Sequence, residues 1–79
     1  MKLKLKFFAS LREIAGKTKE TVESDAKTPR ELWQSIVTIY PNTLEESSLK
    51  VAVNYHYESW DYLLKDGDEV AFIPPVAGG

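Results

Sequence analysis

The chain has 79 residues, a formal net charge of −2 and no cysteine. This length fits one domain, and the lack of cysteine excludes a disulfide framework, thiolate metal ligands and a cysteine nucleophile. Apolar residues make up 43% and charged residues 28% of the chain, which is ordinary for a folded domain, and the slight negative charge argues against a nucleic-acid partner.

No stretch of the sequence has the composition of a secretory signal or of a membrane span, which needs about 18–20 apolar residues. We therefore expect a cytoplasmic protein with no membrane partner. With no disulfide available, its fold must be stabilised by the apolar core.

The first predicted element is a strand over residues 2–8, because apolar and polar residues alternate there with period two. Leu3, Leu5 and Phe7 are expected to face the core, and Lys2, Lys4, Lys6 and Phe8 the opposite side. The S-x-x-E pattern at Ser10 then predicts a short helix over residues 9–15. A second strand is expected over residues 19–23.

The main helix is predicted over residues 29–40. Thr28 suits the cap position, Pro29 suits the first helical position, and Glu31 can close a capping box by bonding back to the cap. Apolar residues recur at helical spacing up to Tyr40, and Pro41 cannot continue the helix.

The second half of the chain predicts short strands and turns. Residues 42–48 are expected to form a loop, 51–54 a third strand, 58–63 a short strand or turn, 65–68 a turn and 69–73 the last strand. Pro74 ends that strand because it has no backbone N–H to donate.

Strands on both sides of one long helix predict an α+β fold. The arrangement that fits is the β-grasp (ubiquitin-like) fold, a mixed sheet with one main helix packed across it and with its first and last strands parallel. The domain is expected to span residues 1–73, and residues 74–79 to form a flexible tail.

The side chains offer no catalytic constellation. His56 is the only histidine and has no partner at ligand spacing, so we interpret it as a surface or structural residue and expect no metal site. Asp66, Asp68 and Glu69 lack the spacing of a calcium loop and are interpreted as a solvated turn.

The C-terminal tail is the remaining candidate. Two prolines fix the direction in which the chain leaves the sheet, two apolar residues follow, and the final glycines can enter a passage too narrow for other residues. Four extended residues reach about 14 Å, enough to place a carboxylate inside another protein. The tail residues are Pro74, Pro75, Val76, Ala77, Gly78 and Gly79.

The reactive group of this tail is expected to be the carboxylate of Gly79. A carboxylate becomes electrophilic when ATP converts it to an acyl-adenylate. Attack by an amine then gives protein conjugation, whereas attack by sulfur gives a thiocarboxylate. Both outcomes are open from the residues alone.

A docking surface is expected beside the tail. If Phe72 packs inward, Ile73 points outward, and Phe8 points outward from the neighbouring first strand. An exposed apolar patch of Phe8, Ile73 and Tyr57 would then mark a protein-binding surface.

These segments resemble the molybdopterin synthase small subunits, the MoaD-type sulfur carriers of the ThiS/MoaD family. The resemblance spans the chain. It is carried by FFA with LRE near the start, VAVN at residues 51–54, and LKDGDEVAFIPPV at residues 64–76 before the final diglycine. Ala77 departs from the serine or threonine that the family often has, and residues 55–62 are more aromatic than usual.

The resemblance implies that Gly79 is adenylated by an E1-like activating enzyme using ATP and then converted to a thiocarboxylate. It also implies that the tail inserts into the large subunit of a heterotetramer and gives sulfur to cyclic pyranopterin monophosphate, two transfers forming the dithiolene of molybdopterin. The chain itself would bind no cofactor. The alternatives are a thiamine-pathway sulfur carrier, a ubiquitin-like protein modifier, or an interaction module with an inert tail.

Overall fold

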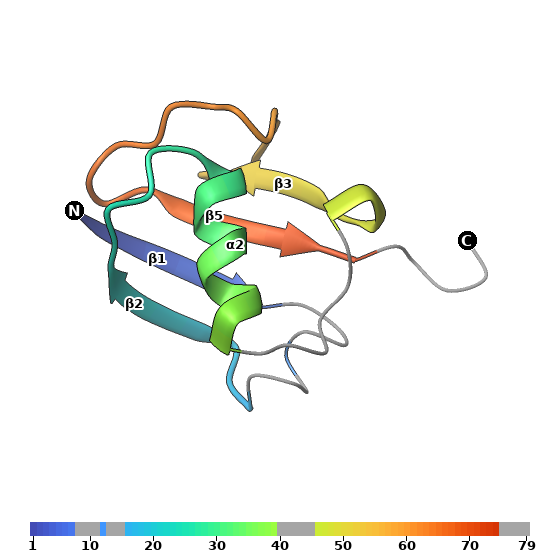
Figure 1. The fold of residues 1–79 in the computed structure, drawn as a ribbon, viewed down its shortest axis with the longest axis horizontal. Coiled ribbons are helices and arrows are strands. Elements are labelled where there is room, and N and C mark those ends of the chain that lie inside the picture. Colours follow the sequence, from blue (N-terminus) through green and yellow to red (C-terminus); the bar gives the residue numbers. More distant parts are fainter. Residues whose placement is uncertain (8–11, 13–15, 40–45, 75–79) are drawn as a thin grey trace.

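The structure is a computed structural model that describes residues 1–7, 12, 16–39 and 46–74. One sheet is crossed on one face by a single long helix (Figure 1). The elements are β1 (Lys2–Phe7), β2 (Lys19–Glu23), α2 (Pro29–Ile39), the 3-10 helix η1 (Glu46–Ser48), β3 (Lys50–Val53), β4 (His56–Glu58) and β5 (Glu69–Ile73).

The described strands lie in the order β2-β1-β5-β3-β4. The first and last strands, β1 and β5, are parallel neighbours, and the other pairs are antiparallel. The predicted α+β, β-grasp arrangement is therefore confirmed, including its parallel central pair. Because β5 is the middle strand, the chain leaves the sheet at Ile73 from its central strand (Figure 1).

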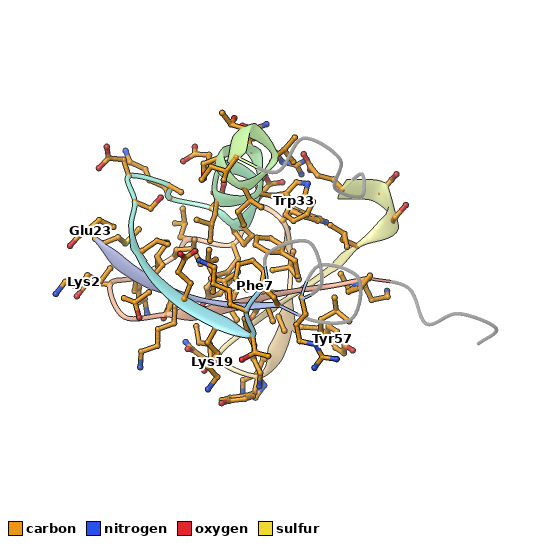
Figure 2. The ribbon with its side chains drawn as sticks, turned by 90° about the horizontal axis from the view of Figure 1, so that it is seen from below. Lys2, Phe7, Lys19, Glu23, Trp33 and Tyr57 are labelled. Atoms are coloured by element: carbon orange, nitrogen blue, oxygen red, sulfur yellow. The ribbon has the colours of Figure 1, made fainter. Side chains whose placement is uncertain are left out.

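The core lies between the sheet and α2, where the alternation of β1 buries its apolar side chains. Leu3, Val70 and Phe72 are at most 1% exposed. The Phe72 ring lies 5.0 Å from Trp33 of α2 and 5.6 Å from Trp60, measured between centroids. Trp33 therefore lies on the helix side of the sheet, whereas Lys19 and Tyr57 project on the opposite side (Figure 2).

The start of α2 follows the predicted cap only in part. Thr28 Oγ1 accepts a hydrogen bond from the N–H of Glu31 at 3.3 Å, which satisfies one of the free donors of the first turn. The predicted return bond from Glu31 to the cap residue is wrong. Glu31 Oε1 instead accepts the N–H of Lys27 at 2.8 Å, the donor one residue before the cap.

Arg30, near the start of α2, forms ion pairs with residues of two other segments, η1 and the loop after β4. Its guanidinium contacts Glu46 of η1 at 2.6 Å and Asp61 at 3.2 Å. The hydrogen bond to Asp61, opposed in part by desolvation, raises the pKa of Arg30 above its usual value. These bonds link η1, near the exit of the tail, to the helix.

The hairpin of β3 and β4 differs from the predicted boundaries. Asn54 and Tyr55 have φ angles of 52° and 72° and form a two-residue turn, since positive φ at both central positions is the geometry of a type I′ hairpin. Strand β3 therefore ends at Val53 rather than at residue 54, and β4 begins at His56 rather than at residue 58.

Two other predicted segments also need comment. Residues 46–48 form η1 instead of continuing a loop. The helix predicted over residues 9–15 lies outside the described residues except for Arg12, which is helical. Tyr40, the predicted last residue of the main helix, also lies outside them.

Asp68 is buried, so the interpretation of its segment as a solvated turn is wrong at this position. It is 8% exposed, and its two carboxylate oxygens accept hydrogen bonds from Asn54 Nδ2 at 2.9 Å and from the N–H of Lys65 at 2.8 Å. Asn54 Oδ1 in turn accepts the N–H of Glu69 at 3.0 Å. This network joins the β3–β4 turn to the first residue of β5.

Candidate functional site

The face of the sheet opposite α2 carries a recess over its central strands. The pairing register aligns Lys6, Ala71, Ala52 and Tyr57 in one row across β1, β5, β3 and β4. Side chains of one row that lie on the same face are neighbours. The two central positions are alanines between longer side chains, so the middle of the row is low.

The recess has a volume of about 220 Å³ and is bounded by the residues of that row, Tyr55, Glu69 and Ile73. Lys6 Nζ lies 5.4 Å from the centroid of the Tyr55 ring, a distance at which the cation is attracted to the ring face. Tyr55 and Tyr57 remain 77% and 71% exposed. The recess therefore has a floor of small residues with two exposed tyrosine rings at its border.

Ile73 connects this recess to the start of the tail. It is half-buried on the outer side of β5, whereas Phe72 before it is 1% exposed, as the alternation predicts. A second hollow of about 320 Å³ lies beside it, bounded by η1, Lys50, Tyr57, Ile73 and Pro74. Tyr57 and Ile73 line both hollows, and Ile73 is the last residue of β5 before the chain leaves the sheet.

The predicted site residues are only partly within the described structure. Pro74 is buried, which fixes the point from which the tail departs. Phe8 and residues 75–79, including Gly79, lie outside the described residues, and their roles stay predictions.

Sequence reasoning missed Lys6, Tyr55, Ala52 and Ala71 as parts of this surface. The alternation of side chains along each strand is enough to assign the two alanines and Lys6 to the outer face of the sheet. It does not show that they are aligned in one row, because that depends on the pairing register. The aromatic segment of residues 55–62 divides in the structure. Trp60 and Tyr62 pack against the core, and the remaining two tyrosines flank the recess.

The described residues hold no group of three or more His, Asp or Glu side chains placed to bind a metal ion. His56 is exposed on β4. Among the described helices, none has the length and apolar composition to cross a bilayer.

The sequence of this chain is similar to those of known proteins along nearly its whole length. The ThiS family model matches residues 5–79. The chain belongs to the ThiS family. It is 41% identical to the molybdopterin synthase sulfur carrier subunit of Escherichia coli (strain K12), over 98% of this chain and 99% of that protein.

Two further proteins mark the range of this family. A Pyrococcus furiosus structure, titled as a candidate subunit 1 of molybdopterin converting factor, is similar with a TM-score of 0.78 and 35% identity, over 96% of this chain and 99% of that chain. The small archaeal modifier protein 3 of Haloferax volcanii is 33% identical over the full length of both chains. The proteins similar to this chain therefore include some named as sulfur carriers and some named as modifiers.

Proposed function

We propose that this chain is the sulfur carrier subunit of molybdopterin synthase and carries sulfur as a thiocarboxylate on Gly79. The observation that carries this proposal is the 41% identity to the Escherichia coli sulfur carrier subunit along nearly the whole of both chains. The recess bounded partly by Ile73 and Tyr57 supports the proposal, because a carrier needs a surface near its tail that its partners can bind.

The proposed reaction activates the terminal carboxylate of Gly79 and then replaces one of its oxygens with sulfur. A carboxylate oxygen of Gly79 attacks the α-phosphorus of ATP on an E1-like activating enzyme, which releases pyrophosphate and forms the acyl-adenylate. A sulfur nucleophile then displaces AMP and leaves the thiocarboxylate. Transfer of that sulfur to cyclic pyranopterin monophosphate, with water restoring the carboxylate, returns the carrier, and two such transfers build the dithiolene of molybdopterin.

The catalytic side chains for the transfer are assigned to the large subunit. The carrier contributes its terminus, and Pro74, Pro75, Val76, Ala77 and Gly78 guide that terminus into the partner's active site. The assembly is a heterotetramer with two carriers, located in the cytoplasm. The carrier binds no cofactor of its own, and ATP belongs to the activating enzyme.

The docking part of this proposal predicts that Ile73→Glu and Tyr57→Glu each weaken binding to the large subunit by about tenfold or more, as expected for an anchor worth about 1–2 kcal/mol. Each change places a charge against the apolar walls of the two hollows. Isothermal titration calorimetry with the purified large subunit measures the effect. Gln34→Glu, on the exposed side of α2, is the matched control and should bind as the unmodified chain does.

The function is tested by mixing the sulfur-loaded chain with the large subunit and cyclic pyranopterin monophosphate and measuring molybdopterin. Product should form in proportion to loaded carrier, with two carriers consumed per dithiolene. The modifier named among the relatives makes protein conjugation the second candidate. Lysine adducts of the chain without molybdopterin formation would favour it.

A further inference from the structure

Strand β2 lies at one edge of the described sheet, with β1 on its inner side. Figure 1 shows it along the lower border of the sheet, away from β3 and β5. An edge strand presents unpaired backbone N–H and C=O groups that can pair with another chain. The question is which strand would fit this edge.

The hydrogen bonds to β1 show which groups of β2 point outward. Ser24 donates its N–H to Met1 at 2.9 Å and accepts from the Met1 amino group at 3.0 Å, and Thr18 accepts from Phe7 at 2.9 Å. Since bonding direction alternates along an antiparallel strand, the even-numbered residues of β2 face β1. Its odd-numbered residues, Lys19, Thr21 and Glu23, therefore present their N–H and C=O groups at the edge.

This edge is complementary to itself. An antiparallel copy centred on Thr21 places Thr21 opposite its counterpart, Lys19 opposite Glu23 of the second copy, and Glu23 opposite Lys19 of the second copy. All three pairs are of the type that exchanges both backbone hydrogen bonds. The side chains at these positions are exposed on one face of the sheet, so each copy's cation meets the other copy's carboxylate there.

The helix side of the strand also has room for this pairing. A hollow of about 350 Å³ lies between β2 and α2, bounded partly by Val22 and Ile39, and Ile39 is 69% exposed. In the same register, Val22 of each copy is a diagonal neighbour of Val22 of the other, on the face opposite the charges.

We propose that two copies of this chain associate through antiparallel pairing of their β2 edges, centred on Thr21, to form one continuous sheet. The existing contacts of the charged pair are long, since Lys19 Nζ lies 4.0 Å from Oε1 of the half-buried Glu69 and Glu23 lies 3.7 Å from the amino group of Met1. Strand β1 separates β2 from β5, so the pairing does not involve the strand that ends at Ile73.

The interface is small, and the pair is therefore weak, with a dissociation constant of about 1 mM or somewhat below. It is also sensitive to ionic strength, because its charges are exposed. Sedimentation equilibrium of the full chain at increasing concentration and at low and high salt measures the association. A reversible dimer that weakens with salt is expected.

Charge exchange tests the register. Lys19→Glu or Glu23→Lys alone places like charges at both symmetric positions and is expected to weaken association about tenfold. An equimolar mixture of these two variants restores it as a mixed pair, because each residue 19 then meets an opposite charge at residue 23. Lys27→Glu, an exposed change of equal charge between β2 and α2, should leave association unchanged.

A backbone test is independent of charge. Thr21→Pro removes an outward N–H without touching the bonds to β1 and should abolish the dimer, whereas Thr21→Val keeps that N–H and should retain it. Circular dichroism checks that both variants fold. A chain that stays monomeric well above the expected dissociation constant, or single charge variants whose mixture does not regain association, overturns the proposal.

Discussion

A chain extended by one alanine after Gly79 is expected to accept no sulfur and to support no molybdopterin formation. The extra residue moves the terminal carboxylate by about 3.5 Å, and its methyl group must enter a passage that the two glycines fit because they have no Cβ. Deletion of Gly79 shortens the tail by the same distance and should have the same effect. Mass spectrometry of the loaded chain and assay of molybdopterin measure the two losses.

Both changes should leave the fold intact, since the core residues of the described part of the chain all lie at or before Phe72. Ala77→Ser is the matched control, because it alters the tail without changing its length or its final glycines. If the extended chain still yields molybdopterin at the rate of the unmodified one, the terminus is not the reactive group.

Asp68→Ala is expected to lower the free energy of unfolding by about 1–3 kcal/mol, because it removes a buried carboxylate that accepts two part-buried hydrogen bonds. The donors of these bonds are Asn54 Nδ2 and the N–H of Lys65. For a domain of this size the loss corresponds to a fall in Tm of roughly 5–20 °C. Thermal unfolding followed by circular dichroism measures it.

Asp66→Ala provides the comparison two residues away. Asp66 also accepts one backbone hydrogen bond, from Lys2 at 2.7 Å, but at an exposed position, where water can replace the lost acceptor. We expect this change to cost less than about 1 kcal/mol. Equal losses for the two variants would show that the buried network does not stabilise the β3–β4 turn against β5.

Local patterns predicted most of this fold. The alternation in Lys2–Phe7 predicts strand β1 and which of its side chains face the core. The bounds predicted for the last strand, Glu69–Ile73, are those of β5. The start of α2 followed from Thr28 and Pro29. These features depend on neighbours within a few residues, so the sequence contains them directly.

The features that were missed depend on contacts between distant residues. Burial of Asp68 requires Asn54, 14 positions earlier. The turn at Asn54 and Tyr55 lacks the glycine that usually marks a type I′ hairpin, so local sequence does not predict its position. The recess requires Ala52 to lie beside Ala71, and only the strand register sets that pair.

The measurement that bears most directly on the proposed function is the intact mass of this chain after incubation with its activating enzyme, ATP and a sulfur donor. The account predicts a mass gain equal to the exchange of one oxygen for one sulfur, located on Gly79 by fragmentation and absent when ATP is omitted. A chain that is adenylated but never gains sulfur, or that gains it at a site other than Gly79, would contradict the account.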